Sequence, residues 1–150
     1  GEDERTNISA VQRADEPPAI VSCPDETSYA AALREAVAAA RDDEGLSAVI
    51  APWKHEAKRL QKLLGDDAPP LADDTASLPA QGVVLITLKL AKGLEFDRVI
   101  VPDASERVFP ADDPLSRRRL YTTLSRATRS LVILAHGELT PLLARKGTHA

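Results

Sequence analysis

Arg126 is the residue whose position most needs a chemical explanation. It lies in the segment LYTTLSRATRSLVIL (120–134), between Ser125 and Ala127, and the apolar run 131–134 that follows has the composition of a buried strand. Arginine carries a permanent charge, and its planar fork of N–H donors matches the oxygens of a phosphate group. An ordinary surface helix does not need a cation at its junction with a core strand. The placement is compatible with a functional site, but from these residues alone a helix arginine in a surface salt bridge is the simpler interpretation.

Other residues with chemical potential follow apolar runs directly. They lie in the segments 52–54, 89–97 and 103–110, which contain lysines, carboxylates, a glycine and the only tryptophan. Parallel sheets covered by helices bind ligands outside the carboxyl ends of their strands. If the apolar runs are such strands, these segments are candidates for ligand contacts.

The elements that must position these residues alternate along the chain. Apolar runs predict strands at 19–23, 47–51, 83–88, 98–104 and 131–135, and helical patterns occupy 25–45, 54–65, 115–128 and 138–146. The strand runs are continuously apolar, which is typical of strands covered on both faces. The sequence therefore predicts an α/β fold with a mostly parallel sheet and helices on both faces.

Two segments lie outside this alternation. Residues 1–18 are polar and end in a double proline, which predicts a flexible N-terminal arm before a single domain over 19–150. Residues 66–82 are rich in Asp, Pro and Ala without periodicity, and we expect an exposed, mobile loop there.

Composition restricts the class of protein. The chain has 150 residues and a net charge of −4, which argues against a dedicated basic nucleic-acid-binding module but leaves room for a local basic groove. Cys23 is the only cysteine, which fits a reducing compartment. The histidines lack metal-ligand spacing, so no metal site is expected, and no apolar run is long enough for a membrane span. We expect a cytoplasmic protein without membrane contact.

Two segments resemble motifs of a known family. TLKLAKGLEFDRVIV (87–101) resembles motif V of superfamily 1 helicases of the UvrD/Rep type, which commonly reads T-x-H-x-x-K-G-L-E-F. LYTTLSRATRSLVIL resembles motif VI, whose core is Y-V-A-L-T-R-A, and VFP (108–110) resembles the F-P that follows motif V. The firm resemblance covers 83–135, and 46–60 is more loosely similar to motif IV. The resemblance implies a RecA-like second motor domain, the C-terminal half of an ATP-dependent DNA helicase or translocase.

The resemblance also implies a partner domain. No phosphate-binding loop of the type G-x-x-x-x-G-K-[ST] occurs in this chain. ATP and Mg²⁺ would therefore lie in a cleft shared with a separate P-loop domain of the same polypeptide, which would hold the metal. We expect the isolated domain to be inactive as an ATPase.

Roles around the nucleotide follow residue by residue from the resemblance. Arg126 matches the motif VI arginine and would be the catalytic arginine finger; a surface salt bridge is the alternative. Glu95 matches the motif V glutamate that contacts the nucleotide sugar, unless it is a turn residue paired with Lys92. Gly93 would permit a positive-φ turn close to the ligand. Lys92 either faces phosphate or pairs with Asp97.

Motif IV departs from the family. Where the family usually has an arginine that contacts the γ-phosphate, this chain has proline, and Lys54 would be a less directional substitute.

The resemblance assigns single-stranded DNA contacts to Lys89 and Thr87. At the position of Lys89 the family often has His, and a Lys there preserves a phosphate contact. Thr87 can donate its hydroxyl to phosphate or instead cap the backbone at the strand end. The basic run 117–119 is expected to be a solvated helix start.

A second departure keeps other functions open. Relatives of the UvrD/Rep type carry a large subdomain between motifs IV and V, where this chain has only 66–82. Short spacing and a similar motif VI occur in the HelD group, some of which act on RNA polymerase. The alternatives are thus an ATP-dependent HelD-like factor that remodels or recycles RNA polymerase, and a degenerate RecA-like interaction module.

Overall fold

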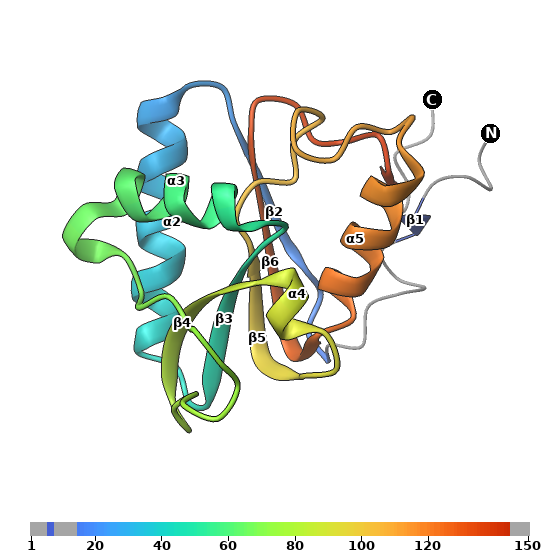
Figure 1. The fold of residues 1–150 in the computed structure, drawn as a ribbon. Coiled ribbons are helices and arrows are strands. Elements are labelled where there is room, and N and C mark those ends of the chain that lie inside the picture. The colour runs from blue at the N-terminus through green and yellow to red at the C-terminus, as the bar shows by residue number, and fades with distance from the viewer. Residues whose placement is uncertain (1–5, 8–14, 145–150) are drawn as a thin grey trace.

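A parallel five-stranded sheet forms the centre of the molecule (Figure 1). The computed structural model of the chain describes residues 6–7 and 15–144. The strand order is β2-β6-β5-β3-β4, and every neighbouring pair is parallel. The strands are β2 (Ala19–Cys23), β3 (Leu46–Ala51), β4 (Gly82–Thr87), β5 (Phe96–Val101) and β6 (Ala127–His136). The predicted parallel α/β sheet is confirmed.

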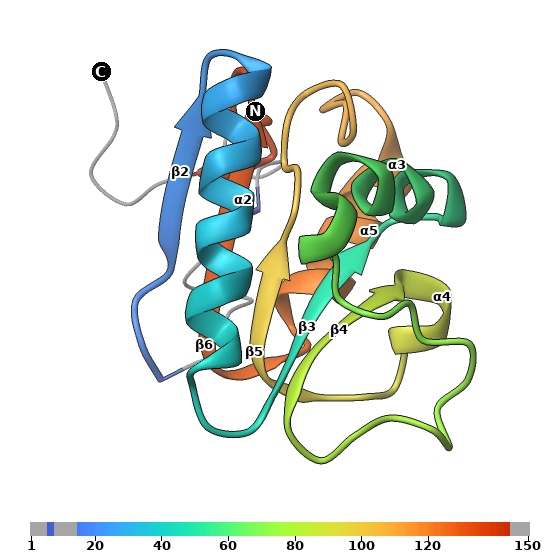
Figure 2. The same ribbon diagram turned by 90° about the vertical axis from the view of Figure 1, so that its left-hand side faces the viewer.

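Helices cover both faces of this sheet, as predicted (Figures 1 and 2). One face carries α2 (Glu26–Arg41) and α3 (Lys54–Leu64), which is followed by the 3₁₀ turn η2 (Gly65–Asp67). The other face carries α4 (Leu88–Ala91) and α5 (Pro114–Leu124). A separate short pair joins β1 (Thr6–Asn7) to β7 (Leu143–Ala144) in parallel.

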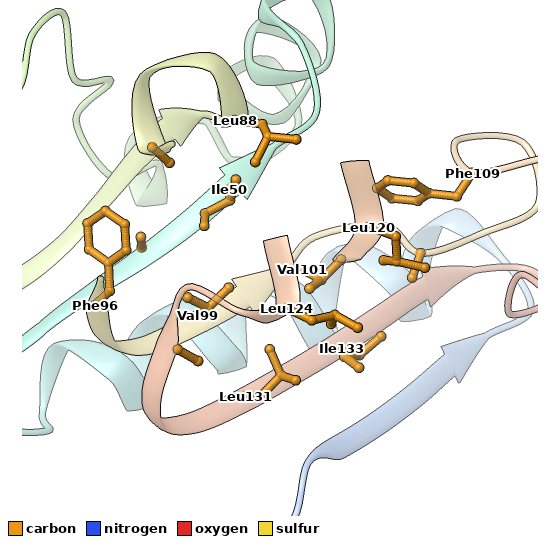
Figure 3. Close-up of a cluster of buried hydrophobic side chains, with 14 of the residues drawn as sticks. Ile50, Leu88, Phe96, Val99, Val101, Phe109, Leu120, Leu124, Leu131 and Ile133 are labelled. Carbon is orange, nitrogen blue, oxygen red and sulfur yellow. The ribbon is translucent and has the colours of Figure 1, made fainter. Parts of the chain in front are cut away.

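Two hydrophobic cores follow from this layering. On the α5 face, Leu120 and Leu124 pack with strand residues such as Val101 and Ile133 (Figure 3). On the α2 face, the buried positions of the helix recur every three to four residues, so that one apolar stripe meets the sheet: Tyr29, Leu33, Val37 and Ala40. Both faces of each central strand are therefore buried, which explains the continuously apolar runs.

The junction between α5 and β6 differs from the prediction. The helix ends at Leu124 rather than at 128, and β6 begins at Ala127 rather than at 131. The strand starts early because Phe96 pairs with Ala127, and the Phe96 amide donates to the Arg126 carbonyl at 2.8 Å. Arg126 consequently lies in the turn between helix and strand and not on the helix.

The predicted helix at 138–146 is wrong over its described part, 138–144. The Thr140 amide donates to the Ala104 carbonyl at 2.8 Å, and its hydroxyl donates to the Phe109 carbonyl at 2.6 Å. Leu139 also forms an antiparallel bridge with Ser105. These contacts with the segment after β5 use the backbone groups that a helix would need. Residues 145 and 146 lie outside the described range.

The segment 66–82 is only partly the exposed loop that was predicted. Pro69 is buried, and the Ala72 amide donates to the Leu85 carbonyl at 2.8 Å. The Leu85 amide donates to the Pro70 carbonyl at 2.9 Å, so this stretch covers the outer edge of β4. Residues 73–77 are exposed. The mobility of this segment remains a prediction. Of the predicted N-terminal arm, residues 1–5 and 8–14 lie outside the described part.

No helix in the described ranges is long and apolar enough to cross a membrane.

Candidate nucleotide and nucleic-acid sites

The predicted site residues fall at two opposite edges of the sheet. Because all five strands are parallel, residues that precede β5 and β6 lie at the amino edge, and residues that follow β3 and β4 lie at the carboxyl edge. Arg126, Gly93 and Glu95 belong to the first group. Lys54 and Thr87 belong to the second. The segment 89–97 runs from one edge to the other, so the expectation that all of it lies at the carboxyl edge is wrong.

Arg126 is fixed at the amino edge by hydrogen bonds to backbone and hydroxyl oxygens. Its Nε donates to the Thr122 carbonyl at 3.1 Å and its Nη1 to the Leu94 carbonyl at 3.2 Å. Its Nη2 donates to the Ser125 hydroxyl at 3.1 Å. These bonds use three of the five N–H donors of a guanidinium. The half-buried side chain thus connects the last turn of α5 to the loop before β5.

The loop that receives Arg126 contains the other two residues assigned to the nucleotide. Leu94 stands between Gly93 and Glu95, so the guanidinium reaches the middle of that trio. Gly93 has φ +82°, as predicted, and no heavy atom lies within 4 Å of the position a Cβ would take. Glu95 is exposed. The loop therefore presents the backbone of Gly93, with space around it, and the exposed carboxylate of Glu95. Both lie near the guanidinium of Arg126, which is held by its hydrogen bonds.

Lys92 is the C-cap residue of α4, in the segment that runs from the carboxyl edge to the amino edge. One alternative for this residue was a pair with Asp97. The Asp97 carboxylate accepts a hydrogen bond from the Leu46 amide at 2.9 Å and lies next to Gly45, at the start of β3. Lys92 instead lines a hollow between α4 and α5 together with Lys89. This location favours an outward-facing cation.

Lys54, Thr87 and Lys89 share a hollow of about 340 Å³ at the carboxyl edge. Leu71, Ala72, Asp73 and Leu90 complete its lining. Thr87 occupies the N-cap position of α4, but its side chain makes no capping hydrogen bond. The capping alternative for its hydroxyl is therefore not supported. Lys54, the first residue of α3, lies with the nucleic-acid candidates and is not brought together with Arg126.

Sequence reasoning missed a second hollow of about 390 Å³, which adjoins the first at Lys89. It is lined by Pro52, Leu88, Lys89, Lys92, Leu115, Arg118, Arg119 and Thr122. The α5 contributors recur at positions 115, 118, 119 and 122, which is the spacing of a single helix face. That spacing was the available signal, but the basic run was interpreted as solvent-facing.

A buried ionic cluster was also missed. The Glu56 carboxylate, on α3, lies 3.0 Å from Nη2 of Arg59 and 3.4 Å from Nη1 of Arg107. The Asp103 carboxylate lies 3.2 Å from Nη2 of Arg107 and 3.6 Å from Nη2 of Arg59. Both acids are only 2% exposed. The cluster therefore attaches the segment after β5 to α3. Its two local pairs, Glu56 with Arg59 and Asp103 with Arg107, lie too far apart in sequence for a local pattern to connect them.

Protonation in this cluster is set by opposing effects. Burial raises the pKa of Glu56, but hydrogen bonds and charge from Arg59 and Arg107 outweigh it and lower that pKa below its ordinary value of 4.5. Burial raises the pKa of the Tyr29 phenol, which donates to the Pro102 carbonyl at 2.6 Å. The carboxylate of Glu56 therefore stays ionised and the phenol stays neutral near neutral pH.

Comparisons with known proteins identify the class of protein to which this fold and these site residues belong. Residues 82–134 match the family model of the UvrD-like helicase C-terminal domain. The crystal structure of the C-terminal domain of a possible DNA helicase from Lactobacillus plantarum WCFS1 matches with a TM-score of 0.77 and 30% identity, over 94% of this chain and 88% of that chain. The fold is RecA-like, and the chain belongs to the UvrD-like helicase C-terminal domain family.

More distant structures share the fold alone. The C-terminal domain of the DEAD-box protein Dbp5 matches with a TM-score of 0.51 and 16% identity, over 84% of this chain and 78% of that chain. The PRRSV nsp10 helicase matches with a TM-score of 0.50 and 15% identity, over 95% of this chain and 29% of that chain. No curated protein matches the sequence.

Proposed function

We propose that this domain is the second motor domain of an ATP-dependent superfamily 1 DNA helicase or translocase. Its amino edge would complete an ATP cleft with a separate P-loop domain of the same polypeptide. The observation that carries the proposal is the hydrogen bond from Arg126 to Leu94, which joins the motif VI arginine to the motif V loop. Residues that the family uses at one nucleotide are thus neighbours in space.

The residues at this edge fit a nucleotide. Gly93 leaves its surroundings open to a ligand, and exposed Glu95 offers oxygens to a ribose hydroxyl, as acidic residues do in dinucleotide sites. Arg126 supplies a permanent cation with a fork that matches phosphate oxygens. The described residues contain no cluster of three or more His, Cys, Asp or Glu side chains that could hold a metal. Mg²⁺ would be held by the P-loop domain.

In this function, bound ATP would supply the phosphoryl group that is transferred, and Mg²⁺ would supply positive charge that neutralises the phosphates. Arg126 would stabilise the negative charge that develops as that group leaves, an effect of roughly a thousand- to a hundred-thousand-fold in rate. Its bonds to Thr122 and Leu94 hold the guanidinium in place before the reaction, so that little reorganisation is required. Lys89 and Thr87, at the opposite edge, would contact single-stranded DNA.

The test compares three variants of the full-length protein. Arg126→Ala should lower single-turnover ATP hydrolysis by about two to four powers of ten with little change in ATP affinity. Arg126→Lys should restore little, because a point charge does not reproduce the fork. Lys89→Ala should spare hydrolysis in the absence of DNA. Normal turnover in Arg126→Ala would reject the arginine-finger assignment.

The isolated chain provides a second test. Since it contains no P-loop, we expect no ATPase activity above that of a buffer control. Robust turnover by the purified chain would contradict the shared-cleft proposal.

A second candidate function is an ATP-dependent HelD-like factor that remodels RNA polymerase. It is favoured by the compact segment 66–82, which covers the edge of β4 and leaves no inserted subdomain between α3 and β4. Co-sedimentation of the full-length protein with core RNA polymerase separates the two candidates. Stable binding to polymerase without DNA-stimulated ATPase activity would favour the second.

A further inference from the structure

The two edge strands of the sheet differ in how they are covered. At the β4 edge, the segment 70–72 pairs with Leu85 through backbone hydrogen bonds. At the opposite edge, β6 is the only strand in the described ranges 6–7 and 15–144 that pairs with β2. Figure 2 shows β2 at the border of the sheet, beside α2. Within that part of the chain, the outer N–H and C=O groups of β2 therefore have no strand to pair with.

β2 lacks the features that usually protect an edge strand from pairing. Lysine, an internal proline or a bulge would discourage a further strand. The sequence of β2, AIVSC, carries no charge, and its register with β6 is continuous. Val21 is 42% exposed, and it lies on the same face of the strand as Cys23, because side chains alternate between faces. A strand added outside β2 would therefore cover Val21.

A hollow of about 420 Å³ opens at the carboxyl end of the same strand. Its lining comes from the end of β2 and from the turn after β6: Ser22, Cys23, Pro24, Gly137, Glu138 and Leu139. The two sides are joined by the hydrogen bond from the Gly137 amide to the Cys23 carbonyl at 2.7 Å. Pro24 and Leu139 supply apolar surface. A peptide that runs along β2 would thus place one of its last side chains over an apolar hollow.

The charge around this hollow is negative. Glu138 lines it and is exposed, and none of the described residues in the lining is Lys or Arg. Asp25 and Glu26 follow Pro24 directly, and both are exposed. A segment with a cation next to an apolar side chain would complement this surface, whereas the phosphates of a nucleic acid would be repelled.

We propose that β2 and the hollow at its carboxyl end bind an extended peptide segment of a partner protein, which adds a sixth strand to the five-stranded sheet. The segment carries an apolar side chain for the hollow and a Lys or Arg for Glu138. In this mode of recognition, main-chain hydrogen bonds give affinity and side-chain pockets give specificity. The surface contains none of the residues assigned to ATP or DNA, so the proposal goes beyond the proposed function.

The experiment selects binders of this chain from a library of phage-displayed random heptapeptides. Enriched sequences should carry an apolar residue next to Lys or Arg and no central proline, because proline removes an N–H donor. Binding of the most enriched peptide, labelled with fluorescein, is measured by anisotropy. Val21→Lys should weaken it about five-fold, since the variant removes an apolar cross-strand contact and adds a like charge. Leu115→Lys is the matched control, because Leu115 is also a large exposed aliphatic residue, at 48%, but lies on α5.

Two further measurements test the charge and the strand pairing separately. Glu138→Gln should weaken binding by about two- to five-fold at low salt and less at high salt, whereas Glu35→Gln, at an exposed position on α2, should not. Hydrogen exchange of the amides in 19–23 that face away from β6 should slow when the peptide binds. A version of the peptide that is N-methylated at alternate residues should bind weakly, because it cannot donate to the edge. Thermal melting of each variant shows that the chain is folded.

Several results would overturn the inference. They are a selection that enriches no peptide, equal binding to Val21→Lys and wild type, and equal losses for Glu35→Gln and Glu138→Gln, which would show a general charge effect. Self-association of the chain that Val21→Lys abolishes, measured by analytical ultracentrifugation, would show that a second copy covers this edge and would reject a separate partner protein. None of these measurements involves ATP or DNA, so the proposed function stands or fails independently.

Discussion

The guanidinium of Arg126 donates to the carbonyl oxygen of Leu94 at 3.2 Å, across 32 positions of sequence. A second donor of the same group bonds to the Thr122 carbonyl in the last turn of α5, where cations favourably satisfy terminal carbonyls. The arginine is therefore positioned by the loop it faces as well as by the helix it follows. The proposed catalytic role would thus share one side chain with a structural role, so the two effects must be measured separately.

The structural share of Arg126 can be measured in this chain alone. Arg126→Ala removes bonds to carbonyls in a half-buried setting, and we expect the free energy of unfolding to fall by about 1–2 kcal/mol in urea titrations. Arg34→Ala is the control, because Arg34 is an exposed arginine that also donates to a carbonyl, that of Leu63 at 3.0 Å. A loss above about 4 kcal/mol would make Arg126 primarily a structural residue.

The start of β3 gives a second prediction. Gly45 has φ +85°, and a Cβ there would collide with the carboxylate of Asp97, which is held by the Leu46 amide. Gly45→Ala should therefore destabilise the domain by about 1–3 kcal/mol. Gly82→Ala is the comparison, since Gly82 also has positive φ, at +105°, but open space around the Cβ position. Equal losses of stability in the two variants would show that the positive φ alone, and not the collision with Asp97, causes the destabilisation.

The sequence was sufficient for the sheet but not for the ends of its elements. Continuous apolar runs predicted the five strands, because strands covered on both faces are apolar along their length. The edge strand β2 differs in its coverage, since four of its five residues are exposed or only half-buried. The start of β6 depends on pairing between Phe96 and Ala127, and the segment 138–144 depends on bonds to Ala104 and Phe109. Such contacts between distant segments override local helix propensity.

The candidate site, like the fold, was predicted where it depends on contiguous residues and missed where it depends on contacts between distant segments. Motif residues were found because they are contiguous, and Arg126 with Gly93 and Glu95 came together as the family resemblance implies. Lys54 was placed at the nucleotide by register alone, and strand direction puts it at the opposite edge. The stacking of Arg119 on Trp53 joins two elements that are far apart in sequence.

Limited proteolysis tests the segment 66–82. Cleavage should concentrate at residues 73–77, which are exposed, and spare 69–72, whose backbone pairs with Leu85. Peptide mass analysis of early fragments would locate the cuts. Initial cleavage within 69–72 would mean that the edge of β4 opens readily.

The buried cluster around Glu56 predicts a specific pH dependence. A folded-state pKa below the ordinary value of 4.5 means that folding favours the ionised carboxylate. The stability from this group is complete above that ordinary value and is lost as pH falls through the lower folded-state pKa. The charged groups that face it are Arg59 and Arg107, with Asp103 and Tyr29 adjoining.

Glu56→Gln should therefore lower the free energy of unfolding by about 1–3 kcal/mol at pH 7, because the amide cannot balance two guanidinium groups. The difference from wild type should shrink as pH falls from about 5 to about 3, since the wild-type carboxylate then becomes protonated. Urea titrations across this range measure both quantities, and Glu35→Gln, at an exposed position on α2, is the isosteric control. A difference that stays constant down to pH 3 would show that packing of the side chain, rather than its charge, stabilises this part of the domain.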